Sequence, residues 1–349
     1  IKATDNLNQN IARRVNVLGT RILPVWNGSS WSEQITRSPA WAVADVLRNI
    51  DYGRKLKDKR MNLTELLRLS QTWAMRGDTC DGMFTDHMTV WDALCRLLEV
   101  GRTKPIYYAG VIDFVRNEPK MLTQAYMFTP DNMLRDSFSV EYVYPKSDDA
   151  DYIIVEYTDN ITNEARQVEC YLSEEKRNRP LTVQMSFCTN RAQAWREGIH
   201  RVAMSQSQRK FPSFTSELEG MLPKYGDKLL LNHDVPEWCA SGYIRSVSGD
   251  IITTSEYLPW TEGASHVMLL RGADGRVQGS FAVTKIDDST ARITGNPYIA
   301  TDGGEVPTQY TFGTTEKVGL EAIMLSASPD DDKNVAISCV NYSDYPHQV

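Results

Sequence analysis

Four side chains that could bind a metal ion or transfer a proton lie within seven positions of one stretch, KYGDKLLLNHDVPEWCASGYI at residues 224–244. They are His233, Asp234, Glu237 and Cys239. Imidazole, carboxylate and thiolate groups bind zinc, and a histidine beside an acidic residue can act in acid–base catalysis. One hypothesis is therefore a hydrolase with its site around His233, Asp234 and Glu237.

The same stretch also has the pattern of a β-hairpin. Residues 228–234 read as one strand, and the alternation over residues 243–247 reads as the returning strand. Consecutive residues of a strand point to opposite faces, so His233 and Asp234 would need a bulge to face one metal ion. The pattern favours the hairpin, and we predict that this region is inert.

Motifs that mark other enzyme classes do not occur in the sequence. There is no HExxH, no GxSxG and no Walker A lysine loop. The glycines at 272–275 and 303–304 lack the strand–GxGxxG–helix context of a dinucleotide site. The other histidines are scattered, at His87, His200, His266 and His347. We therefore expect no catalytic residue, no metal and no cofactor, and we predict that the chain is not an enzyme.

The composition is that of a folded protein with an acidic balance. The 349 residues are 41% hydrophobic and 24% charged, and this length suits two domains. A net charge of −7 argues against non-specific nucleic-acid binding, which needs a basic surface. No apolar run reaches the ~20 residues that span a bilayer, and the six cysteines lack zinc-site spacing. Because the first residue is Ile1 and not methionine, we expect a fragment or a processed product.

Helix signals are concentrated before residue 101, after an expected N-terminal strand at about 1–22. Ser38 followed by proline predicts a helix over residues 39–49, and Asn62 predicts another over 62–76. Thr89 predicts a third helix that ends before residue 101. Residues 104–117 read as β structure with a turn at Gly110. Four tryptophans fall on predicted helices, where we expect core roles: Trp41, Trp73, Trp91 and Trp195.

From about residue 128 the pattern becomes β-rich. Residues 137–144 and 151–159 alternate and are joined by a turn-like segment, which predicts a hairpin. One helix near 190–209 interrupts, and its predicted apolar face is Ala192, Trp195, Ile199 and Val202. Further hairpin turns are predicted at Asp274-Gly275, Asp287-Asp288-Ser289 and Asp330 to Asn334. The sequence thus predicts an α+β domain over 1–128 and a β-rich, barrel- or sandwich-like domain over 129–349.

Several segments, in order, resemble a known family. They are TRSPAWAVADVLRN (36–49), KPIYYAGVIDFVRN (104–117), FTPDNMLRDSFSVEYVYPKSDDADYIIVEYTD (128–159), NRAQAWREGIHRV (190–202) and YGDKLLLNHDVPEWCASGYI (225–244). In this order and spacing they resemble the central region of host-specificity proteins, the tail-tip attachment proteins of lambda-like siphophages. The resemblance covers about residues 20–345.

The resemblance implies a structural role in a phage or prophage tail tip. It implies a trimeric central hub that closes the tail tube and takes part in host attachment and DNA ejection. The implied partners are two further copies of the chain, tail proteins of the distal-tail and tape-measure types, and DNA as passing cargo. Contact with the host surface would lie outside this fragment. No catalytic residue of the family carries over to this chain, which would be made in the host cytoplasm.

Two alternatives from other classes stay open. A carbohydrate-binding module of a tail or cell-surface protein would bind sugars on exposed aromatic side chains. A hydrolase would act through His233, Asp234 and Glu237. Threefold assembly favours the hub, glycan-dependent melting shifts favour the binding module, and turnover or a bound metal favours the enzyme.

Overall fold

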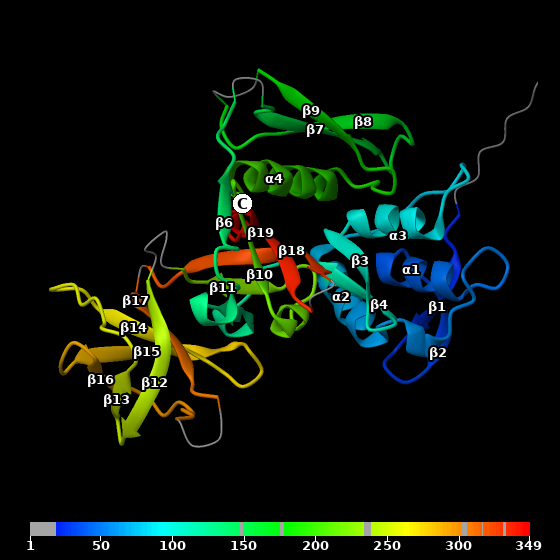
Figure 1. Cartoon of the computed structure of the whole chain (residues 1–349). Coiled ribbons are helices and arrows are strands. Elements are labelled where there is room, and N and C mark those ends of the chain that lie inside the picture. Colours follow the sequence, from blue (N-terminus) through cyan, green and yellow to red (C-terminus); the bar gives the residue numbers. More distant parts are fainter. Residues whose placement is uncertain are drawn as a thin grey trace, which may run out of the picture.

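The computed structural model describes residues 19–146, 149–174, 178–233, 239–301, 306–315, 317–330 and 333–349. Over these residues the fold is α+β, with five α-helices, many strands and a closed six-stranded antiparallel barrel. This confirms the predicted fold class. Figure 1 shows the barrel at one end, a helix-rich unit at the other, and an open sheet between them. Most of the strand expected at about 1–22 lies outside the described residues.

The helix-rich unit combines two hairpins with three helices. Its elements are β1 (Ile22–Trp26), β2 (Trp31–Ile35), α1 (Pro39–Arg48), α2 (Leu63–Arg76), α3 (Val90–Glu99), β3 (Thr103–Tyr108) and β4 (Val111–Arg116). Strand β1 pairs with β2 and β3 pairs with β4, both antiparallel. The β3–β4 turn has positive φ at Ala109 (49°) and Gly110 (82°), as the tightest hairpin turns require.

The helix boundaries follow the capping signals of the sequence. The Asn62 side chain accepts a hydrogen bond from the Glu65 backbone N–H at 3.1 Å, and α2 ends at Gly77 in the left-handed conformation. The Thr89 hydroxyl accepts from the Asp92 N–H, also at 3.1 Å. Helix α1 begins with Pro39. All three predicted helices in this part of the chain are confirmed.

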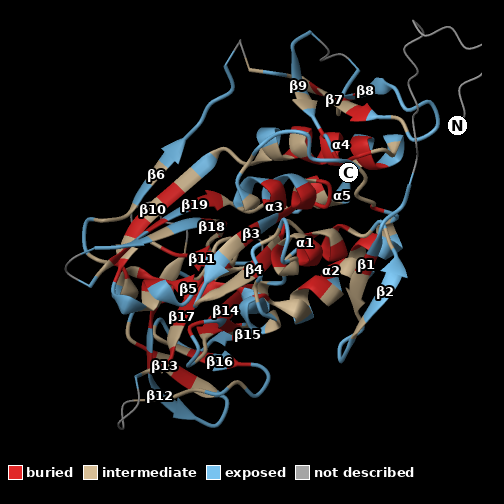
Figure 2. Cartoon of the chain, turned by 90° about the vertical axis from the view of Figure 1, so that its right-hand side faces the viewer, coloured by how far each residue is buried: buried red, intermediate tan, exposed pale blue. Residues whose placement is uncertain are grey.

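A three-stranded sheet covers the fourth helix. Strands β7 (Tyr152–Thr158), β8 (Ala165–Cys170) and β9 (Pro180–Gln184) have the order β8-β7-β9, with β9 parallel to β7. Figure 2 shows α4 (Arg191–Ser207) lying between this sheet and helices α3 and α5 (Tyr345–Gln348). A single core extends from the helix-rich unit through α4 to this sheet.

Two of the four tryptophan predictions are wrong. Trp41 and Trp73 are buried in the first core, but Trp91 is 42% exposed and Trp195 is 44% exposed. On α4 the buried face contains the small residues Ala194 and Gly198. A Cβ at Gly198 would collide with side chains of β7 and β8, so the helix lies too close to the sheet for a tryptophan.

A six-stranded sheet forms the middle of the molecule. Its order is β5 (Tyr126–Phe128), β11 (Lys228–Leu231), β18 (Leu320–Pro329), β19 (Val335–Asn341), β10 (Lys210–Ser216) and β6 (Ser139–Tyr142). Only the β5–β11 pair is parallel. The turn predicted between residues 330 and 334 is confirmed, because it joins the antiparallel pair β18 and β19.

The hairpin predicted between residues 137–144 and 151–159 is wrong. Strand β6 pairs with β10 in the middle sheet, whereas β7 pairs with β8 and β9 in another sheet. Alternation shows that a segment has one buried and one exposed face, but many partner strands satisfy that pattern. The turn-like residues between them form a connection from one sheet to another.

The barrel closes in the order β12 (Ala240–Ser248), β13 (Ile251–Thr254), β16 (Thr290–Ile293), β15 (Val277–Lys285), β14 (His266–Arg271) and β17 (Gln309–Thr314). Its interior is packed with side chains such as Ile244, Met268 and Phe312, so it is a core and not a channel. The hairpin turns predicted at Asp274-Gly275 and at residues 287–289 are confirmed, since they join β14 to β15 and β15 to β16.

Candidate functional site

The stretch around His233 is a connection between two sheets. Strand β11 ends at Leu231 in the middle sheet, and β12 begins at Ala240 in the barrel, so the predicted hairpin is wrong. The His233 ring stacks on Phe138 with centroids 4.5 Å apart. Asp234 and Glu237, the two acidic members of the sequence cluster, lie outside the described residues.

Cys239 is a half-buried free thiol. Its Sγ donates a hydrogen bond to the Lys317 carbonyl at 3.3 Å. Burial raises the thiol pKa to about 11, so the thiolate that binds metals is scarce at neutral pH. Within the described ranges, no three His, Cys, Asp or Glu side chains are grouped so that they could hold a metal ion.

His266 has a structural role in the barrel. Its Nε2 accepts a hydrogen bond from the Thr261 N–H at 3.1 Å, and its ring stacks on Phe312. Trp260 packs edge-on against both rings. These contacts hold the 261–265 loop against the barrel wall.

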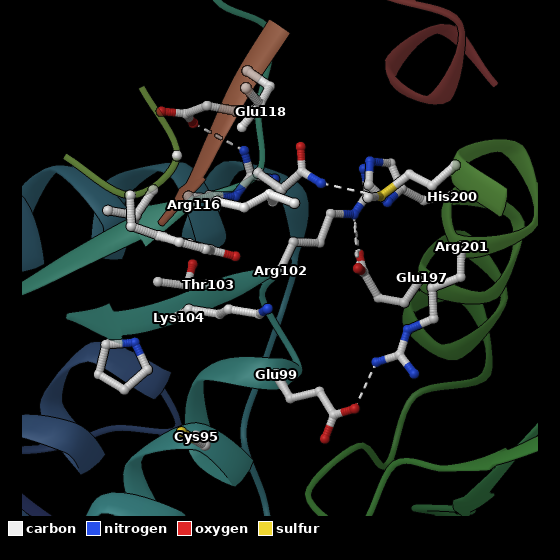
Figure 3. Close-up of a pocket in the computed structure, with 18 of the residues that line it drawn as sticks. Cys95, Glu99, Arg102, Thr103, Lys104, Arg116, Glu118, Glu197, His200 and Arg201 are labelled. Atoms are coloured by element: carbon white, nitrogen blue, oxygen red, sulfur yellow. Dashed lines mark hydrogen bonds and ion pairs between the residues drawn. The ribbon is translucent and has the colours of Figure 1, made fainter. Parts of the chain in front are cut away.

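The candidate site is a cavity of about 670 Å³ at the junction of the helix-rich unit, α4 and the middle sheet (Figure 3). Five parts of the fold line it: α3, the β3–β4 hairpin with the segment after it, α4, the loop with Tyr225 before β11, and strands β18 and β19. Its volume falls in the range of small-ligand pockets, roughly 300–1,000 Å³. The charged and amide- or hydroxyl-bearing lining residues, apart from Tyr225, are Arg96, Glu99, Arg102, Thr103, Lys104, Arg116, Asn117, Glu118, Lys120, Glu197, His200, Arg201 and Gln208.

Sequence reasoning missed this cavity because its lining residues are spread from Trp91 to Val340. No local motif marks such a site. The one available signal was the density of basic residues between 96 and 120, where five of the lining cations occur. That signal alone does not indicate that β18 and β19 complete the wall.

Glu197 and Arg102 form a buried ion pair at the edge of the cavity. The Arg102 Nε lies 2.7 Å from Glu197 Oε2, and Arg76 Nη2 lies 3.2 Å from Oε1. Burial raises the pKa of Glu197 and lowers that of Arg102, while each charge opposes the shift of the other. The pair ties α4 to the start of β3.

His200 is buried beside this pair, with its ring 5.3 Å from that of His347. Burial, reinforced by the charge of Arg102, lowers its pKa to about 2. The imidazole is therefore neutral across the physiological range and too weak a base for general acid–base catalysis. Cys95, also in the cavity, has its thiol pKa raised by burial. Neither the imidazole of His200 nor the thiol of Cys95 carries a charge at neutral pH.

Comparisons with known proteins give partial structural similarities. The virion of a native gene transfer agent particle matches with a TM-score of 0.46 and 13% identity, over 78% of this chain and 51% of that one. A tail protein from Neisseria meningitidis MC58 matches with a TM-score of 0.33 and 11% identity, over 65% of this chain and 63% of that one. The 43 kDa tail protein of prophage MuSo2 from Shewanella oneidensis matches with a TM-score of 0.29 and 10% identity, over 60% of this chain and 55% of that one. The structure is similar in part to tail proteins.

The chain spans between about half and two thirds of the length of these proteins. No protein-family model and no curated protein sequence matches it. Each TM-score is below 0.5, so the similarity extends to part of the fold only. In the part of the chain that the structure describes, every helix is too short or too polar to cross a bilayer.

The middle sheet has an exposed edge at β6. Strand β6 pairs with β10 on one side, and no other described strand pairs with it. Tyr142, Val143 and Tyr144 are all exposed along this edge, Tyr144 by 75%. An edge with apolar side chains and unpaired backbone groups is a surface to which another strand can bind.

Proposed function

We propose that this chain is a structural component of a phage or prophage tail tip, a trimeric central hub that closes the tail tube and takes part in host attachment and DNA ejection. The observation that carries the proposal is the ordered sequence resemblance over about residues 20–345. The cavity chemistry supports a non-enzymatic role, because its one histidine is held neutral by burial. The exposed β6 edge supports assembly with other chains.

In this role three copies surround the tail axis in closed cyclic symmetry. Each copy contacts one neighbour through one surface patch and the other neighbour through a different patch. Tail proteins of the distal-tail and tape-measure types are neighbours, and host contact is made by parts outside this fragment. The net negative charge of the chain suits a surface that lines the path of DNA, because an excess of carboxylates repels the phosphates of DNA. The exposed turn with Asp287 and Asp288 is a candidate for such a wall, although Lys285 pairs with Asp288. Asp331 and Asp332 lie outside the described residues.

The test is a reconstruction of the intact tail tip by electron cryomicroscopy. We expect three copies of this chain around the axis, with an axial surface in which acidic side chains outnumber basic ones. A chain that is absent from the axis, or that lines it with a mainly basic surface, contradicts the proposal. The purified chain alone does not decide the matter, because neighbouring tail proteins supply part of the interface.

A melting assay addresses the carbohydrate-binding alternative. Two of the tryptophans that a sugar-binding strip would need, Trp41 and Trp73, are buried in the first core. A glycan that raises the melting temperature of the purified chain in a saturable way would favour that alternative.

A further inference from the structure

The cavity at the junction of α3, α4 and the middle sheet is basic in a chain that is acidic overall. Its lining holds six basic side chains and three acidic ones, whereas the whole chain has a net charge of −7. The basic residues are Arg96, Arg102, Lys104, Arg116, Lys120 and Arg201, and the acidic ones are Glu99, Glu118 and Glu197. A concave surface with charge of one sign attracts ligands of the opposite sign.

The three carboxylates of the lining are already paired. Glu197 pairs with Arg102 and Arg76, Glu118 with Arg116 and Arg68, and Glu99 with Arg201. Each pair has N–O distances between 2.6 and 3.2 Å. The three carboxylates of the lining are therefore already in ion pairs with other cations.

Three cations of the lining have no such partner. No carboxylate within the described ranges lies at ion-pair distance from Arg96, Lys104 or Lys120, although Lys104 lies over the Tyr225 ring. Burial lowers the pKa of Lys120, and the nearby charges of Asp227 and Glu118 offset that shift only in part. An anion in the cavity would offset the rest of the shift.

Arg116 adds a buried donor without an acceptor. Its side chain is only 6% exposed, and its Nη1 bonds to Glu118 at 3.0 Å. Its Nε has no hydrogen-bond partner among the described residues. A buried donor left without an acceptor destabilises the structure by about 1–3 kcal/mol, so an acceptor at this position is favoured.

The cavity lining also includes apolar side chains. They are Val115, Ile323, Leu325 and Val340, together with the Tyr225 ring over which Lys104 lies. Leu325 is 37% exposed, so a ligand that fills the cavity would remove apolar surface from water as well as neutralise charge. A ligand that matches this lining has both carboxylates and an apolar side chain.

We propose that this cavity binds an acidic peptide segment of another protein, with carboxylates at Arg116, Lys120 and Lys104 and an apolar side chain on Leu325. Lys104, Arg116 and Lys120 lie on different parts of the fold. A ligand with several carboxylates spaced along a chain can therefore reach them better than one compact ion can. The three glutamates in the lining disfavour a densely charged polyphosphate. The proposal rests on the proposed function only for the source of the segment, a neighbouring tail protein.

Calorimetric titration of the full chain tests the proposal. The probe is a blocked five-residue peptide that alternates aspartate and leucine, and the matched control is the same peptide with asparagine for aspartate. We expect binding of the acidic peptide that weakens as salt is added, and at least tenfold weaker binding of the asparagine peptide. Equal binding of the two peptides, or no binding of either, overturns the proposal.

Variants of the cavity lysines locate the site. Lys120→Gln and Lys104→Gln should each weaken binding of the acidic peptide by about fivefold or more, since each removes one charged partner. Lys210→Gln is the control, because Lys210 lies on β10 outside the cavity and next to Tyr142. Lys104 is exposed, so its variant tests the site even if Lys120→Gln fails to fold. Unchanged affinity in both cavity variants contradicts the assignment.

Succinate separates a peptide from a small acid as the ligand. We expect succinate to bind at least tenfold more weakly than the peptide, because it cannot cover the apolar side chains of the lining. Succinate binding that equals peptide binding overturns the peptide assignment. None of these outcomes depends on where the chain lies in a virion, so failure here and failure of the hub proposal are separate results.

Discussion

His200 illustrates how burial decides the chemistry of a residue. Among the five histidines it alone lies on a predicted helix beside apolar residues, and from that pattern a structural role is the expected one. The structure adds the reason, since its ring is 1% exposed and lies near the charge of Arg102. Its Nε2 has no partner among the described residues, so protonation would place an uncompensated charge in the core.

A pH dependence of stability follows from His200. The unfolded chain takes up a proton on this histidine below pH 6.5, whereas the folded chain, with a pKa of about 2, does not. Falling pH therefore favours the unfolded state, and this one group should lower the free energy of unfolding by about 2 kcal/mol between pH 7 and pH 5. Urea denaturation at the two pH values should show that His200→Gln removes about this much of the loss.

Comparing the wild type with His200→Gln separates the contribution of His200 to the pH dependence of stability from the contributions of other titratable groups. His347 has its pKa lowered by burial and adds a loss of the same sign, while the raised pKa of Glu197 gives a gain as pH falls. Both contributions occur in the wild type and in the variant. His87→Gln, at an exposed histidine, is the control. If His200→Gln loses as much stability as the wild type, then His200 is not held neutral.

Elements were predictable from the sequence where local rules determine them. The first three helices begin after Ser38, Asn62 and Thr89, because helix starts depend on residues that are close in the chain. The side chains of Asn62 and Thr89 cap their helices, whereas α1 begins with a proline and has no side-chain cap. Strand partners were predictable only across short turns, such as Asp274-Gly275. The pairings of β6 with β10 and of β11 with β18 join segments far apart in sequence, which alternation does not encode.

The edge strand β6 gives a prediction about assembly. The Val143 N–H donates to the Arg209 carbonyl at 2.8 Å, so by alternation the Tyr142 N–H points away from β10. Tyr142→Pro should keep the melting temperature within a few degrees, but block the addition of a strand from another chain. Incorporation of the variant into assembled tails, measured by mass spectrometry of purified particles, should therefore fall sharply.

Glu141→Pro is the matched control for this edge. Its N–H faces β10, so this substitution should lower the melting temperature by disrupting the β6–β10 pair. Normal incorporation of Tyr142→Pro into tails would show that this edge is not used in assembly. A large loss of stability in Tyr142→Pro would instead show that the strand register differs from the one described.

In the whole molecule, the barrel is an insertion in the middle sheet. The chain leaves the sheet at Leu231 and returns at Leu320, and these two residues are partners in the β11–β18 ladder. The domain boundary expected near residue 128 stays a prediction, which limited proteolysis can test. The barrel has a core of its own, and every strand in it pairs with two barrel neighbours.

Because its strands leave no open edge, the barrel should fold when it is separated from the rest of the chain. We expect residues 239–318, produced alone, to give a β-type circular dichroism spectrum and one cooperative thermal transition. The midpoint should be lower than that of the barrel within the full chain, because Leu269 and Val277 lose their contacts with Met127 and Leu230. The backbone bond from the Val277 N–H to the Ala125 carbonyl, 2.9 Å long, is lost as well. A fragment that melts without a cooperative transition would show that the barrel depends on the β5 edge of the middle sheet for its fold, and the two would then form one folding unit.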